Sequence, residues 1–119
     1  MRLAIRLLGP ALLLTVLAVG CAAQPATSPA PAVAGTQISI KGFAFNPNQP
    51  SVTKGAAITW TNDDGTTHTV TSGVPGTPSG KFNQSLDAGK TFSFTFTETG
   101  TYEFFCNIHN SMRGTVTVK

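Results

Sequence analysis

The sequence predicts an all-β fold, a β-sandwich built from short strands. Only 11% of its 119 residues are charged, whereas the strand formers Thr, Val, Ile and Phe are abundant. Apolar and polar residues alternate over short segments, and Gly, Pro, Asn and Asp separate these segments at regular intervals. No segment of the globular part is long and periodic enough to form a core helix. Short strands separated by turn residues are typical of a sandwich.

Eight strands are predicted. In chain order they occupy residues 36–41, a short segment that begins at 52, and then 57–62, 69–72, 81–86, 91–97, 101–105 and 114–118. In the first strand Ile38 and Ile40 share one face, and Phe43 and Phe45 continue this alternation beyond it. The Asn- and Pro-rich segment 46–50 is predicted to be a turn or loop.

The middle of the chain combines a core strand with turn-forming residues. Ile58 and Trp60 of the third strand are predicted to face inward. The Asn-Asp-Asp-Gly segment at 62–65 favours a turn that delivers His68 to the start of the next strand. The segment 73–80 contains two prolines and is predicted to be a loop at the sheet edge.

The clearest period-two pattern is a stripe of three phenylalanines, Phe92, Phe94 and Phe96, which we assign to the core and to no chemistry. The strand that follows this stripe leads directly to Cys106. The closing strand, 114–118, is predicted to turn its valines inward.

Residues 1–20 have the organisation of an export signal. Arg2 and Arg6 form a positive n-region, and the apolar run 11–19 is shorter than the roughly 20 residues that span a membrane. The segment ending at Cys21 is similar to a bacterial lipoprotein box, in which the cysteine is acylated. We favour lipidation of Cys21; the alternative is ordinary cleavage after Ala23. Either way we expect an exported protein, periplasmic or at the cell surface, and acyl chains would anchor it to a membrane.

Residues 21–36 are rich in Ala, Pro, Ser and Thr, a composition that cannot bury a core and predicts a solvated linker. The globular domain is predicted to be 37–119. Without Arg2 and Arg6, six basic residues face five acidic ones, and no basic stripe remains. This charge pattern argues against nucleic acid as a partner.

Cys106, His109 and Met112 lie within seven residues at the spacing C-x2-H-x2-M, and His68, the other histidine, lies upstream. Two His, one Cys and a weak axial Met form the ligand set of a blue-copper electron-transfer site. Taken singly, each residue would more often be structural. Because the chain has only 2 His and 2 Met in 119 residues, chance is the weaker account of this spacing.

Two segments resemble those of cupredoxins of the plastocyanin/amicyanin type. Residues 50–70 are similar to the family's strand-turn-strand that leads to its first copper His, and 100–106 to the strand that leads to its copper Cys. The short gap between His109 and Met112 resembles amicyanin. The resemblance covers about 37–119 and implies a Greek-key β-sandwich, the cupredoxin fold.

By this resemblance, His68, Cys106 and His109 bind one type 1 copper ion nearly in a plane, with Met112 farther away on the axis. Cys106 would bind as the thiolate. His109 would lie at the surface and provide the route for electrons.

The resemblance also implies how the ligands are held. The family position after the first His is often Asn, which ties the two ligand segments together; here it is Thr69. We therefore expect altered bracing, with Asn107 supplying part of the missing bond. Gly114 is expected to let the chain turn back into the sheet.

The sequence therefore predicts a small exported type 1 copper protein that shuttles single electrons between redox partners and is not an enzyme. Partners are expected to dock transiently near His109, on a patch that Asn110 and Ser111 make more polar than in amicyanins. We expect a monomer.

Several alternatives use the same residues. A periplasmic protein that stores or delivers copper would need the same ligands, and zinc would also fit a His2Cys set. A multicopper oxidase would need further His clusters, and a Cys-His hydrolase would need a third orienting group beside Cys106 and His109. A metal-free adhesion sandwich predicts that Cys106→Ala and Met112→Leu have no effect.

Overall fold

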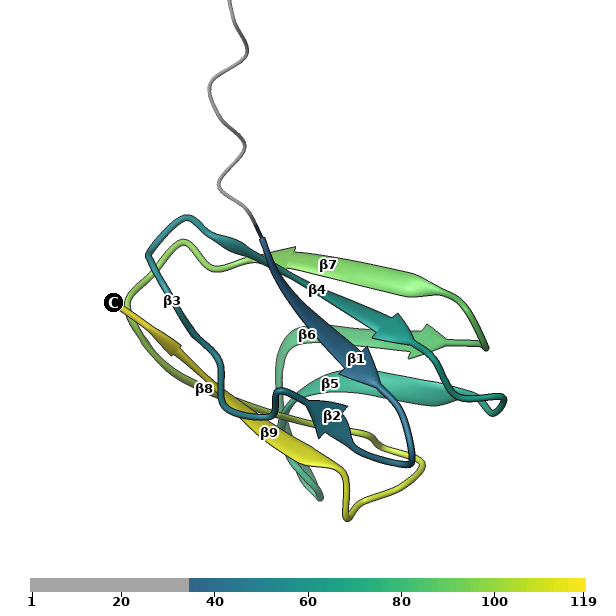
Figure 1. Cartoon of the computed structure of the whole chain (residues 1–119). Helices are drawn as coiled ribbons and strands as arrows, with labels where there is room; N and C mark the ends of the chain where they lie inside the picture. The colour runs from purple at the N-terminus through teal and green to yellow at the C-terminus, as the bar shows by residue number, and fades with distance from the viewer. Residues whose placement is uncertain (1–34) are drawn as a thin grey trace, which may run out of the picture.

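The computed structural model describes residues 35–119, which form two β-sheets that face each other (Figure 1). The first sheet contains, in order across it, β2 (Phe45–Asn46), β1 (Thr36–Ile40), β4 (Ala57–Asn62) and β7 (Thr91–Thr95). The second contains β3 (Ser51–Val52), β9 (Arg113–Val118), β8 (Gly100–Phe105), β5 (His68–Val74) and β6 (Thr77–Leu86). No helix occurs among these residues. The predicted all-β sandwich is confirmed. The predicted signal segment 1–20, Cys21 and most of the linker 21–36 lie outside the described residues.

The core lies between the sheets and is rich in aromatic rings. Trp60 of β4 is fully buried, and its ring lies 5.5 Å from that of Phe104 on β8 and 5.6 Å from that of Phe82 on β6. Ile58 is also fully buried, as predicted from its alternation with Trp60. Because these contacts join strands of opposite sheets, they fix how the two layers pack.

One core prediction is confirmed in part, and one is wrong. Of the three phenylalanines in the stripe, Phe96 is buried, but Phe92 and Phe94 are only partly buried because β7 lies at the edge of the first sheet. Phe43 does not continue the alternation of β1. It lies in the turn between β1 and β2 and remains 54% exposed.

The segment 73–80 is a β-hairpin rather than a loop. β5 continues to Val74 and β6 begins at Thr77, so only Pro75 and Gly76 turn the chain. Pro78 is tolerated because β6 is an edge strand, where a missing N–H breaks no inner ladder. The register shifts between Thr71 and Gly73, and the positive φ of Gly73, 104°, accommodates this irregularity.

Neighbours in the sheets are often far apart in sequence, as a Greek key requires. β5 pairs with β8 in antiparallel register, with Thr71 opposite Phe105. β5 begins at His68, and β8 ends one residue before Cys106. The sheet thus brings the two predicted ligand segments side by side at one end of the sandwich.

Candidate metal centre

The turn that presents His68 is organised by Asn62. This side chain is fully buried, and its amide nitrogen donates to the carbonyls of Thr66 and Leu86 at 2.8 Å each. Its amide oxygen accepts the backbone N–H of Asp64 at 3.0 Å. These three bonds fix the course of the chain between β4 and β5, and so fix where Asp64 and His68 lie.

The carboxylate of Asp64 sets the orientation of the His68 ring. Asp64 Oδ2 lies 2.9 Å from His68 Nε2, and an ionised carboxylate can only accept a hydrogen bond. Nε2 therefore carries a proton, which leaves Nδ1, the ring nitrogen that faces His109 and Cys106, as the one that can present a lone pair to them. The backbone N–H groups of Phe43 and Gly42 also donate to this carboxylate. These two bonds, with a smaller contribution from His68, lower the pKa of Asp64 below its usual value.

The segment from Cys106 to Met112 forms a closed loop between β8 and β9. The Cys106 N–H donates to the Met112 carbonyl at 3.0 Å, and the Met112 N–H donates to the His109 carbonyl at 2.9 Å. Cys106 and Met112 are buried, whereas His109 is only partly buried. The loop therefore holds three of the four predicted ligands on one short segment, which two backbone hydrogen bonds close.

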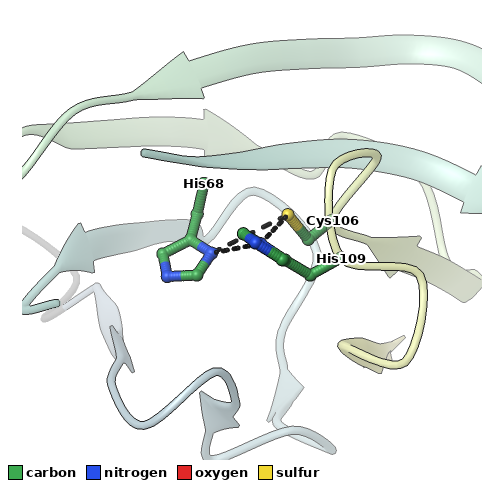
Figure 2. Close-up of side chains that lie close together, drawn as sticks. All are labelled: His68, Cys106 and His109. Atoms are coloured by element: carbon green, nitrogen blue, oxygen red, sulfur yellow. Dashed lines mark hydrogen bonds between the residues drawn. The ribbon is translucent and has the colours of Figure 1, made fainter. Parts of the chain in front are cut away.

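Three of the four predicted ligands, His68, Cys106 and His109, converge on one point, as Figure 2 shows. His68 Nδ1 lies 3.1 Å from His109 Nδ1, and Cys106 Sγ lies 3.9 Å from the first and 3.7 Å from the second. A circle through atoms at these separations has a radius of about 2.1 Å, close to a metal–imidazole bond length of about 2.0–2.1 Å.

The chemistry of this donor set also fits a metal ion. Nδ1 of His68 points a lone pair at Nδ1 of His109, and such a contact is favourable only if a cation or proton lies between the two atoms. The third donor is a buried thiol, whose sulfur accepts the N–H of Thr69 at 3.3 Å. Two nitrogens and one soft sulfur suit copper in both of its common oxidation states.

Thr69 ties the two ligand segments together. Continuing the β5–β8 register places it opposite Asn107, whose N–H donates to the Thr69 hydroxyl at 2.7 Å. That hydroxyl also lies 3.0 Å from the hydroxyl of Thr71, which donates to Asn83 at 2.9 Å. The bracing at Thr69 is therefore altered but not lost, because the threonine hydroxyl accepts the bond itself. The expected contribution from Asn107 is present through its backbone.

The sequence model of the family described as copper binding proteins, plastocyanin/azurin family, matches residues 32–119. The chain belongs to this family. The resemblance drawn from the sequence is thus confirmed, and copper is the cofactor of this cupredoxin.

Named relatives agree with this assignment. Amicyanin-alpha of Methylorubrum extorquens is 33% identical over 104 residues, which cover 86% of this cupredoxin and 86% of the relative. Plastocyanin of Sambucus nigra is 41% identical over 87 residues, covering 64% of this chain and 88% of the relative. A solved purple cupredoxin from Nitrosopumilus maritimus aligns with a TM-score of 0.65 at 32% identity, over 71% of this chain and 99% of that one.

Two residues beside the candidate metal centre are not predicted from the sequence. The sequence predicts only a turn at Asp64, although its position four residues before His68 is a usable signal. It predicts Phe43 on an alternating strand face, yet the centre of the Phe43 ring lies 5.3 Å from that of His68 and 4.9 Å from that of His109.

The role of Gly114 also differs from the expectation. It already lies within β9, and a Cβ there would overlap the ring of Phe104. Glycine is therefore needed for space against the Phe104 ring rather than for a turn.

Among the described residues, 35–119, there is no helix that could span a membrane.

Proposed function

We propose that this cupredoxin is a type 1 copper protein that carries single electrons between redox partners, with His68, Cys106 and His109 as strong ligands. The observation that supports this most directly is the convergence of two imidazole nitrogens and one buried sulfur, all within 4.8 Å of one another. Met112, buried at the end of the same loop, is proposed as the weak axial ligand.

Copper would supply the one-electron chemistry, and the protein's contribution is to hold its ligands still. Asp64 orients the His68 ring, and the Thr69 N–H stabilises negative charge on the Cys106 sulfur. The loop from Cys106 to Met112 is closed by its own two backbone bonds. A rigid set of ligands changes little between oxidation states, which favours fast electron transfer over metal exchange.

We propose that partners dock transiently at the face where His109 reaches the surface. Phe43 and Ile108 are the large hydrophobic side chains exposed among residues 35–119, at 54% and 55%. The Phe43 ring contacts the His109 ring, and Ile108 directly precedes His109 in the sequence. Asn110 and Ser111 add polar groups to the same face. A small mixed patch suits the weak interfaces of redox encounters.

We propose no catalytic activity, because two histidines and Cys106, the one cysteine of the predicted domain 37–119, cannot build a second copper centre. We also propose export by residues 1–20, an anchor at lipidated Cys21, a linker over 21–36 and a monomeric domain over 37–119. Acyl chains at Cys21 would place the domain at a membrane face, and the linker would let it reach partners there.

The test is a Cu(II) titration of the purified protein, followed by visible absorption and EPR, beside Cys106→Ala. We expect an intense thiolate-to-copper band that saturates at one equivalent, bleaches reversibly with reductant and is absent from the variant. Tight copper binding without this band would contradict electron transfer and favour storage or delivery. An unchanged band in Cys106→Ala would contradict the ligand assignment.

A further inference from the structure

Phe43 occupies a backbone conformation that phenylalanine rarely adopts. It lies in the turn over residues 41–44 between β1 and β2, which the Lys41 N–H closes by donating to the Ala44 carbonyl at 3.0 Å. Both central residues have positive φ, 62° at Gly42 and 58° at Phe43, and Phe43 is the only non-glycine residue with positive φ in the described range. Hairpin turns of this kind normally place glycine at the second central position. A bulky side chain there is a departure that packing alone does not require.

The ring of Phe43 is not packed into the core. Its side chain stays 54% exposed, and its contacts are edge-to-face with the two imidazoles of the metal centre. The interplanar angles are 86° with His68 and 87° with His109, so the ring stands nearly upright against both ligands. The phenyl group thus covers the side of the histidine pair that would otherwise face solvent.

The turn that carries this ring is fastened to the metal centre by Asp64. One carboxylate oxygen accepts the Gly42 N–H at 2.7 Å, and the other accepts the Phe43 N–H at 3.0 Å and the His68 Nε2–H at 2.9 Å. Consecutive backbone N–H groups in such a turn form a concave site for an anion. One carboxylate therefore fixes the orientation of a ligand and the position of the ring that covers it.

We propose that Phe43 is a cap on the copper site, a positioning residue that holds the His109 ring in place and restricts the access of small ligands and chelators to the metal. This proposal rests on the proposed copper function. The unfavourable backbone conformation at Phe43 is retained because a side chain is needed at this position, where glycine would fit the turn better.

A cap predicts that replacing Phe43 changes the rate of copper loss without lowering the stability of the fold. Phe43→Gly removes the ring and places at this φ the residue that adopts it most readily. We expect the melting temperature of the metal-free variant to be unchanged or raised. We expect EDTA to remove Cu(II) at least about tenfold faster than from the wild type, and azide to alter the EPR spectrum of the variant alone. Phe43→Tyr, which keeps the ring, should restore the wild-type rate.

Ile108→Ala is the matched control, because Ile108 is exposed to the same extent, at 55%, and adjoins His109 in sequence, but carries no aromatic ring. Its copper loss should match the wild type. Equal rates for Phe43→Gly and wild type would overturn the cap while leaving the copper function intact. A fall in melting temperature that parallels the faster copper loss would also overturn it and assign Phe43 to structure. A wild type without the thiolate-to-copper band would overturn the proposed function and the cap with it.

Discussion

His68 and Cys106 reach the candidate metal centre from neighbouring strands, but the segments around them are held by different kinds of bond. The chain before His68 is fixed by side chains, because Asn62 makes three hydrogen bonds and Asp64 makes three more. The loop after Cys106 is closed mainly by its own backbone bonds, and Asn110 within it is exposed.

This difference predicts where each segment is sensitive to substitution. Side-chain bonds disappear with a single mutation, whereas backbone bonds survive most of them. The turn before His68 should therefore depend strongly on the identity of a few polar residues. The ligand loop should tolerate changes at its exposed positions, as long as the ligands and the tie to β5 remain.

The largest effect is expected at Asn62. Asn62→Ala removes the two bonds to the carbonyls of Thr66 and Leu86 and the bond from the Asp64 N–H, and each lost bond costs about 1 kcal/mol. We expect the free energy of unfolding to fall by about 3 kcal/mol in urea titrations of the metal-free protein. Asn110→Ala, in the exposed part of the ligand loop, should change it by less than about 0.5 kcal/mol. Comparable losses at the two asparagines would contradict the distinction between the segments.

A smaller effect is expected at Thr69, where the two segments are joined. Thr69→Val keeps the shape of the side chain but leaves the Asn107 N–H unpaired, which should cost about 1–2 kcal/mol of stability. Thr69→Ser retains the hydroxyl and should recover most of this loss. The reduction potential should shift in the valine variant and stay near the wild-type value in the serine variant. A shift of equal size in both variants would show that the methyl group, rather than the hydroxyl, is what matters.

The strands and the candidate ligands could be predicted from the sequence because both are local signals. The alternation of Ile58 and Trp60 is visible over a few residues, and so is the spacing of Cys106, His109 and Met112. The hairpin over 73–80 could not be predicted, because Pro78 is tolerated within a strand there only by virtue of the edge position of β6 in the sheet. That position depends on the whole fold.

The residues that position the candidate ligands could not be predicted either, because their contacts also depend on the whole fold. Asp64 acts on Gly42 and Phe43 only because the β1–β2 turn folds back against the β4–β5 turn, and the residues involved are 21 and 22 positions apart. Thr69 replaces an asparagine of the family pattern, and its bond to Asn107 depends on the register between β5 and β8. Such partners follow from the pairing of distant segments rather than from any local pattern.

The smallest effect we predict is the dependence of stability on pH that Asp64 causes in the segment before His68, which side-chain hydrogen bonds hold. The N–H groups of Phe43 and Gly42 lower the pKa of this carboxyl in the folded protein, whereas in the unfolded chain it is about 4. The carboxylate therefore stabilises the fold fully above the unfolded pKa, and this contribution is lost as the pH falls through the lowered, folded pKa.

Asp64→Asn removes the charge at every pH and so isolates this contribution. At pH 6 the metal-free variant should melt below the wild type, because a neutral amide is a weaker acceptor for the turn and for His68. The difference in melting temperature should narrow below pH 4, as the wild type itself loses the charge. Glu103→Gln, on β8 and exposed, controls for the general effect of removing a carboxylate. A difference that stays constant from pH 6 to pH 3 would mean that the turn is held by the shape of the side chain rather than by its charge.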